Sequence, residues 1–389
     1  MLSENTEILY MGTEQKPNAL NPETPPIYPA SAYIIDDTQD YEFANNGGKY
    51  FYNRTANPNR DGLGEAISYL ENGQSTLICS SGMAAISTTL FSLLKSGDHA
   101  IFSKDIYGET IELISMLRNF GIDITTADFT DINALKTLFK ANTKLVYTEI
   151  IANPLTQVVD IEKISSLAHQ HNCLTVVDST FTTPFVIKPI NFGADIVIHS
   201  LTKFFGGHSD VTGGSITSSK EIINKIKHSY LLLGAVLDAN SSWLIQRSVK
   251  TLGLRMKAQL NNACLLAKAL KNIPSVKEVY FPGLEEHPQH KLAKKIFSNG
   301  YGTMISFRVE DNRDKVDRFM HSLKTVKYLG TLGGIRTTIA HPVSAFRGEF
   351  TNEELYNMGL TEGLIRISTG AEDINDLIAD FTQALEVFG

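Results

Sequence analysis

The sequence has little of what marks extracellular, membrane-spanning or nucleic-acid-binding proteins. Its 389 residues include only three cysteines, Cys79, Cys173 and Cys264, and no Cys-x-x-Cys pair, so neither a zinc ribbon nor a redox dithiol is indicated. No apolar run approaches the ~18 residues that a membrane-spanning helix needs. With 35 basic against 42 acidic residues, the chain lacks the positive charge of a general nucleic-acid binder.

The same absences indicate where in the cell the protein is located. A sparse, odd number of cysteines is typical of a reducing environment, and the first residues contain neither the basic nor the apolar region of a signal peptide. We therefore expect a cytoplasmic protein that binds neither nucleic acid nor a membrane. The ten histidines never adopt the His-Glu-x-x-His spacing of a zinc hydrolase, and we expect no metal.

The composition is that of an ordinary globular protein, with 42% hydrophobic and 20% charged residues. At about 150 residues per domain, the chain predicts two to three domains. Residues 1–55 differ from the rest because they are rich in residues that interrupt helices: Pro17, Pro22, Pro25, Pro26, Pro29, Gly47 and Gly48. We interpret this segment as an extended arm, either a linker or an arm that embraces a neighbouring subunit.

After the arm, short apolar runs alternate with helical segments. The runs predict strands at 75–79, 100–102, 122–125, 144–148, 174–177 and 195–199, and helices are expected at 63–70, 83–94, 111–120, 132–140 and 161–170. This alternation predicts a mostly parallel, covered sheet in a large domain over residues 56–240. Ligands of such sheets gather at the carboxyl ends of the strands.

The last part of the chain, residues 241–389, predicts a smaller α+β domain. A long helix is expected over 241–270. Strand-like stretches follow at 276–280, 303–309 and 364–368, and the chain ends in a helix.

The most informative segment is DIVIHSLTKFFGGHSD, residues 195–210. A strand leads into Ser200, Thr202 and Lys203, and a glycine pair follows. Most lysines are simply solvated at the surface. Here, however, the two hydroxyls suit a phosphate group and the glycines allow the backbone to approach it closely. Lys203 is therefore a candidate reactive amine.

Two further segments end at the same expected edge of the sheet. Asp178, in TVVDSTF, terminates an apolar run and would need a partner if buried, although an acid there can also cap a turn. In CSSGMAAI, the Ser-Ser-Gly before an apolar helix offers unpaired amides to an anion, although serine is also a common helix cap.

Together these segments resemble the Cys/Met-metabolism family of pyridoxal-phosphate (PLP) enzymes, which includes cystathionine γ-synthase, cystathionine γ- and β-lyases and methionine γ-lyase. The resemblance runs from YNRTANP near residue 52 to LIRISTGAED near residue 364. It implies a fold-type I, aspartate-aminotransferase-like α/β enzyme. Such an enzyme has a large domain with a mostly parallel seven-stranded sheet, a smaller C-terminal α+β domain and an extended N-terminal arm. Leu201 is one departure, because the family usually has a small residue there.

The resemblance implies roles for the residues that match the family's motifs. Lys203 would hold PLP covalently and then carry protons between Cα, Cβ and the leaving group. Asp178 would pair with the pyridine nitrogen. Tyr107, in KDIYGET, would stack on the ring and act as an acid or base. Asn153, in EIIANP, would hydrogen-bond the ring hydroxyl.

The resemblance also assigns the anionic ends of cofactor and substrate. The phosphate would be bound by two backbone amides and two hydroxyls, those of Gly82, Met83, Ser200 and Thr202. Arg366 would bind the substrate α-carboxylate with its planar fork, and Thr331 stands where the family often has a substrate-binding serine.

Tyr52 and Arg54, in YFYNRTANP, match family residues that reach from one subunit to the phosphate in the site of its neighbour. The residue that Tyr52 matches also contacts the substrate. The resemblance therefore implies a homo-oligomer, a tetramer built from dimers with shared active sites. Each site would bind a small amino-acid substrate.

The sequence departs from the cystathionine-using members at charged positions. Those members usually have glycine and arginine where Glu109 and Glu112 stand, and glutamate where Arg336 stands. One interpretation is a local ion pair between Glu112 and Arg336, worth ~0–1 kcal/mol if exposed. The other is that recognition of the distal end of the substrate has changed, with Glu109 and Arg336 among the substrate-binding residues. The distal carboxylate of cystathionine would then meet Glu112 and bind more weakly, and Glu109 would favour a cationic distal group.

We therefore predict a PLP-dependent lyase that catalyses γ-elimination, and also β-elimination, on sulfur-containing or related γ-substituted L-amino acids, giving an α-keto acid and ammonia. The alternative is γ-replacement, of the cystathionine γ-synthase or O-acylhomoserine sulfhydrylase type. A non-catalytic binding protein is a third hypothesis, against which the intact Lys203, Asp178, Tyr107 and Arg366 argue.

Overall fold

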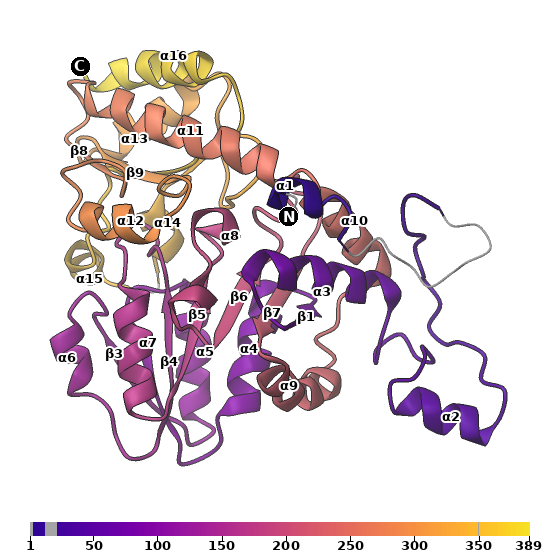
Figure 1. The fold of residues 1–389 in the computed structure, drawn as a ribbon. Coiled ribbons are helices and arrows are strands. Elements are labelled where there is room, and N and C mark those ends of the chain that lie inside the picture. Colours follow the sequence, from indigo (N-terminus) through magenta and orange to yellow (C-terminus); the bar gives the residue numbers. More distant parts are fainter. Residues whose placement is uncertain (1–2, 12–21, 349) are drawn as a thin grey trace.

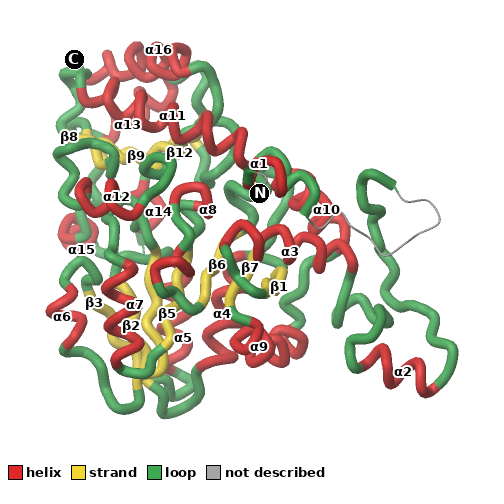
Figure 2. The backbone as a smooth tube through the Cα atoms, viewed as in Figure 1, coloured by secondary structure: helices red, strands yellow, loops and turns green. Residues whose placement is uncertain are grey.

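The computed structural model describes residues 3–11, 22–348 and 350–389. The chain forms two sheets, each covered by helices, and a segment near the N-terminus extends to one side (Figures 1 and 2). Pro17 of the expected arm lies outside the described residues. Within the part of the chain that is described, no helix is long and apolar enough to cross a membrane.

The larger sheet has seven strands in the order β1-β7-β6-β5-β4-β2-β3. These are β1 (Ser75–Cys79), β2 (His99–Ser103), β3 (Asp123–Ala127), β4 (Thr143–Glu149), β5 (Leu174–Asp178), β6 (Ile196–Ser200) and β7 (Gly214–Ser218). Strands β2 to β6 pair in parallel, and β7 is antiparallel to both β1 and β6. The expected α/β class and mostly parallel sheet are confirmed. β7 is not predicted because GSITS contains a single aliphatic residue.

Alternate residues of the central strands face opposite layers of helices. In β2, Phe102 packs with α4 (Gly82–Leu93), α5 (Gly108–Arg118) and α9 (Lys220–Leu233), whereas Ile101 packs with helices of the other face. The remaining elements of this part are α3 (Pro58–Glu71), α6 (Ile132–Lys136), α7 (Ile161–Gln170), α8 (Thr183–Val186) and the 3₁₀ helix η1 (Pro189–Phe192). Helices therefore cover both faces of the sheet, as buried parallel strands require.

The second half of the chain contains a five-stranded sheet in the order β10-β11-β12-β9-β8. Its strands are β8 (Glu278–Tyr280), β9 (Met304–Arg308), β10 (Lys327–Tyr328), β11 (Thr338–Ala340) and β12 (Leu364–Ser368). The helices here are α10 (Ala239–Val249), α11 (Leu252–Lys271), α12 (His290–Ile296), α13 (Arg313–Ser322), α14 (Pro342–Phe346), α15 (Asn352–Asn357), α16 (Ile374–Leu385) and the 3₁₀ helix η2 (Glu386–Phe388). β10 and β11 are too short to give a periodic signal in the sequence.

The expected single helix over 241–270 is wrong, because the structure divides it into α10 and α11. Side chains occupy the carbonyl of Ser248 at the end of α10: the Thr251 hydroxyl donates to it at 3.1 Å and Arg255 Nη2 at 3.0 Å. The apolar spacing continues across the break, so periodicity alone does not reveal it.

The N-terminal segment is an arm only in part. Helix α1 (Glu4–Glu7) lies against the body, and Ile8 is buried beside Leu63 and Ile67 of α3. By contrast, α2 (Thr38–Asn45) stands apart from the rest of the fold (Figure 1). Ile34, four residues before α2, is 90% exposed. The boundaries of the arm and of the two domains stay predictions.

Candidate functional site

A cavity of about 250 Å³ lies at the carboxyl ends of β4, β5 and β6, opposite the first turn of α4 and the middle of β12. Ten of the residues expected from the sequence line it: Gly82, Met83, Tyr107, Glu109, Asn153, Asp178, Ser200, Thr202, Lys203 and Arg366. The parallel strands bring these distant segments to one edge of the sheet, as is general in open α/β sheets.

Lys203 lies in a tight turn directly after β6. Its carbonyl accepts the amide of Gly207, at 2.7 Å, and Gly207 has a φ of +70°. Gly333 passes so close that a Cβ there would lie 2.9 Å from Cβ of Lys203. Burial, followed by the charge of Arg366, lowers the pKa of Lys203. The neutral amine, which is the nucleophilic and basic form, is therefore more populated than for a solvated lysine.

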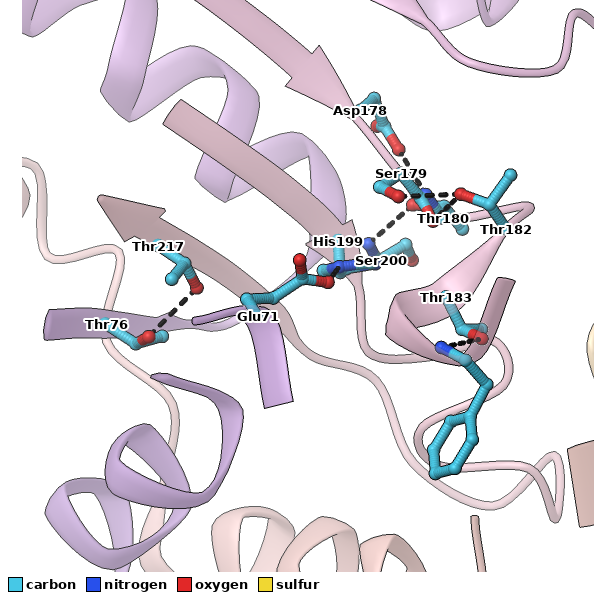
Figure 3. Close-up of polar contacts among 11 residues, drawn as sticks. Glu71, Thr76, Asp178, Ser179, Thr180, Thr182, Thr183, His199, Ser200 and Thr217 are labelled. Atoms are coloured by element: carbon cyan, nitrogen blue, oxygen red, sulfur yellow. Dashed lines mark hydrogen bonds and ion pairs between the residues drawn. The ribbon is translucent and has the colours of Figure 1, made fainter. Parts of the chain in front are cut away.

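Asp178 and Ser200 are connected through Thr180 (Figure 3). The Thr180 amide donates to Oδ1 of Asp178 at 2.9 Å, and the Thr180 hydroxyl accepts the Ser200 amide at 2.9 Å. Burial raises the pKa of Asp178, against the lowering effect of the Thr180 hydrogen bonds and of His199. Thr180 thus fixes the acid relative to the lysine loop.

A fully buried pair of side chains, His199 and Glu71, lies next to this edge of the large sheet. His199 Nε2 lies 2.5 Å from Oε1 of Glu71, the last residue of α3 (Figure 3). The pair fastens the end of β6, next to Ser200, to that helix.

The first turn of α4 and the end of β6 form a set of anion-binding donors. The first amides of a helix have no partner within it, and the Ser81 hydroxyl caps only that of Ala84, at 3.0 Å. Gly82 is needed because a Cβ there would lie 2.8 Å from Cβ of Ser200. The amides of this turn and the Ser200 hydroxyl therefore lie close together at one wall of the cavity, and such a set of donors suits a phosphate.

Arg366 reaches the cavity from β12. Its Nη1 donates to Oδ1 of Asn153 at 3.1 Å, and its Nη2 to the carbonyl of Thr331 at 3.4 Å. Its buried Nε has no partner among the described residues. Burial lowers the pKa of Arg366 to about 10, so the guanidinium remains charged at neutral pH and keeps donors for a further carboxylate.

Tyr107 and Glu109 stand at the mouth of the cavity, at the start of α5. Tyr107 is 42% exposed. Burial, followed by a hydrogen bond to Glu109, raises the pKa of Tyr107 to about 12, so its hydroxyl is protonated at neutral pH. Glu109 is exposed and forms no ion pair with any described residue.

Glu149, the last residue of β4, lines the cavity but is absent from the residues expected from the sequence. It is 7% exposed, and its Oε1 accepts the Tyr107 amide at 2.6 Å. Burial, followed by the charge of Asp178, raises its pKa well above the ordinary value. An acid that ends the apolar run KLVYTE carries the same signal that identified Asp178, and could have been found by it.

Four charged or aromatic residues expected at the site do not line this cavity. Tyr52 and Arg54 lie on the surface, where Arg54 stacks 5.5 Å from the Tyr52 ring and donates to the carbonyl of Leu231 at 2.8 Å. Glu112 and Arg336 are also exposed, and within the described residues no ion pair joins them. The ion-pair interpretation is therefore wrong for this chain, and the substrate role of Arg336 stays a prediction.

The groups in the cavity fit PLP. A lysine with a lowered pKa, a buried acid on the next strand, and helix amides beside a serine are the amine, pyridine-nitrogen and phosphate partners that this cofactor requires. The close approach of Gly82 to Ser200 leaves no side chain in the phosphate position.

Comparison with known proteins gives the same result over the whole chain. The profile of the Cys/Met metabolism PLP-dependent enzyme family matches residues 5–386. An L-methionine gamma-lyase of Fusobacterium nucleatum subsp. polymorphum is 40% identical over 93% of both chains. A cystathionine beta-lyase of Lactococcus lactis subsp. cremoris is 40% identical over 99% of this chain and 100% of its own.

Among solved structures, the cystathionine gamma synthase of Xanthomonas oryzae pv. oryzae, in complex with aminoacrylate and cysteine, superimposes with a TM-score of 0.92. It is 34% identical over 100% of this chain and 98% of its own. The expected fold-type and cofactor are confirmed. The chain belongs to the Cys/Met metabolism family of PLP-dependent enzymes.

Proposed function

We propose that this PLP enzyme is a lyase that removes the γ-substituent of sulfur-containing L-amino acids, and the β-substituent of cysteine-like ones. The products are a thiol, an α-keto acid and ammonia, with one water consumed. The observation that supports this most strongly is that Lys203, Arg366 and Tyr107 line one cavity. Lys203 has a lowered pKa, Arg366 keeps an unused donor, and Tyr107 is 42% exposed at the mouth.

Under this proposal, Lys203 holds the cofactor covalently and Asp178 pairs with its pyridine nitrogen. Asn153 contacts the ring hydroxyl, and the phosphate is bound by the first turn of α4 and two hydroxyls, through Gly82, Met83, Ser200 and Thr202. PLP supplies an electron sink that stabilises negative charge at Cα. The Thr202 hydroxyl accepts the Gly213 amide at 3.0 Å and donates to the Gly213 carbonyl at 3.3 Å, so it would exchange the longer bond for one to the phosphate.

The protein's own groups then move the protons. Arg366 binds the α-carboxylate and so orients the Cα–H bond. The freed Lys203 amine removes the proton from Cα, and for γ-elimination it also takes one from Cβ. Burial has lowered the pKa of this amine, which suits a general base near neutral pH. The protonated Tyr107 hydroxyl stands where the leaving sulfur would depart and can donate its proton to it.

Glu109 bears on the choice of substrate. Because it lines the mouth and forms no ion pair with a described residue, although its charge acts on Lys203, we propose that it disfavours substrates with an anionic distal group and favours neutral or cationic ones. The distal carboxylate of cystathionine would meet this residue, rather than Glu112.

The alternative of γ-replacement is retained because a synthase is among the similar structures. In that reaction an added thiol would take the place of the departing group at Cγ.

We also propose that Tyr52 and Arg54 complete the phosphate site of a neighbouring subunit in a tetramer of two dimers. Support comes from their exposure and their absence from the cavity of their own chain. A cytoplasmic location is supported by three cysteines that are all unpaired in the structure.

A substrate panel read by mass spectrometry tests the function. The panel contains L-methionine, L-homocysteine, cystathionine, L-cysteine and O-acetyl-L-homoserine, each with and without added sulfide or cysteine. The proposal expects keto acid and ammonia from the sulfur amino acids without an added thiol. Formation of a new thioether as the main product would favour γ-replacement, and no reaction with any member of the panel would overturn the proposal.

A further inference from the structure

Two buried acids stand side by side on the floor of the cavity. Glu149 and Asp178 are the last residues of the neighbouring parallel strands β4 and β5, and they are direct partners in the register of the sheet. Both line the cavity. Two carboxylates in such adjacent buried positions cannot both ionise readily, because like charges raise one another's cost of ionisation.

The surroundings of the two acids indicate which of them carries the charge: the Thr180 side chain and His199 favour the anion of Asp178, whereas only acids act on Glu149 through their charge. Asp178 accepts the Thr180 amide at 2.9 Å and lies near the His199–Glu71 pair. Glu149 likewise accepts one backbone amide, that of Tyr107, but the charged groups that act on it are acids, Asp178 and Asp105, and it forms no ion pair with a described residue. The anion is therefore better stabilised on Asp178, which leaves the proton on Glu149.

Glu149 also fixes the residue at the cavity mouth. Its Oε1 accepts the backbone amide of Tyr107 at 2.6 Å. Tyr107 precedes α5, where no side chain caps the helix, so this bond ties the start of the helix to the end of β4. Without the acceptor, a partly buried amide would lose its partner and the ring of Tyr107 would lose its fixed position.

We propose that Glu149 is a positioning residue of this active site, which as a neutral acid holds Tyr107 over the cavity and leaves Asp178 as the single anion on its floor. The inference depends on the proposed function only because the proposed elimination reaction is the one used to measure kcat and KM. A Gln at this position keeps the acceptor and the neutral charge, whereas Leu keeps the approximate size and removes the acceptor. The E149Q and E149L variants therefore separate the hydrogen bond from the bulk of the side chain.

The test uses holoenzyme of the wild type, E149Q and E149L. Steady-state kinetics and the visible circular dichroism of bound PLP are measured for all three, together with thermal unfolding as a check of folding. We expect E149Q to keep kcat within about threefold of the wild type with unchanged dichroism. For E149L we expect a loss in kcat of about tenfold, equal to ~1.4 kcal/mol, with a smaller change in KM and an altered dichroism.

Infrared spectroscopy gives a second readout that does not depend on turnover. The difference spectrum between wild type and E149Q at neutral pH should contain the C=O band of a protonated carboxylic acid. Absence of that band, together with a tenfold loss of kcat in E149Q, would show that Glu149 is ionised and overturn the proposal. Wild-type kcat and dichroism in E149L would overturn the positioning role. If E149L does not fold, E149Q and the infrared band still decide. If the wild type turns over no sulfur amino acid, the proposed function fails, whereas dichroism and infrared still test Glu149.

Discussion

Replacement of Gly333 by alanine should damage the site through the backbone of Lys203. Gly333 has a φ of +77°, and a Cβ there would lie 2.9 Å from Cβ of Lys203 and 2.9 Å from the amide nitrogen of Phe204. The left-handed backbone alone costs alanine about 1–2 kcal/mol, and the overpacking adds about 1–3 kcal/mol. The variant should therefore lose about 2–5 kcal/mol of stability. A shift of the lysine approaching 1 Å can lower kcat by up to ~100-fold.

Gly234 provides the matched control. It has a φ of +69° at the end of α9, and an added Cβ would meet nothing within 4 Å. G234A therefore carries the backbone strain without the clash, and it should lose about 1–2 kcal/mol while kcat stays unchanged. Scanning calorimetry and steady-state kinetics of both variants make the comparison. The reasoning is refuted if G333A matches G234A in both stability and kcat.

Three further predictions concern the charged residues. R366A should raise KM for L-methionine by about tenfold or more, because the α-carboxylate loses a charge-assisted partner; an unchanged KM in steady-state assays would contradict the clamp. E109Q should lose its preference for a substrate with a cationic distal group. The kcat/KM for S-(2-aminoethyl)-L-homocysteine, divided by that for the neutral S-propyl-L-homocysteine, should fall by about fivefold, the effect of ~1 kcal/mol for an exposed charge pair. An unaltered ratio would show that Glu109 does not select the substrate. Inactive R54A and K203A subunits can be mixed, dissociated and reassembled. The mixture should regain about a quarter of wild-type activity, because half of the dimers are mixed and each mixed dimer has one complete site of two. Mixtures that stay inactive would argue against shared sites.

Residues that end apolar strands were predictable from the sequence. Asp178 and Lys203 could be placed at one edge of the sheet because apolar runs lead directly into them, and the parallel arrangement brings such ends together. Arg366 and Tyr107 were reached only through the resemblance to a family, because nothing local distinguishes them from an ordinary strand arginine or exposed tyrosine.

Other features depend on tertiary contacts that a sequence pattern does not contain. The break between α10 and α11 arises from side chains that take the carbonyl of Ser248. The absence of a Glu112–Arg336 ion pair depends on where two exposed side chains lie. Glu149 ends a strand as Asp178 does, but its role comes from its contact with the Tyr107 amide, which the pattern of its own segment does not contain.

The central claim is that the Lys203 amine holds the cofactor and moves the protons. Borohydride reduction of the holoenzyme, followed by digestion and mass spectrometry, fixes and locates any covalent link between PLP and a lysine. The account predicts a cofactor adduct on the peptide that contains Lys203 and on no other peptide. An adduct on a different lysine, or none in an enzyme that still turns over its substrate, would contradict it.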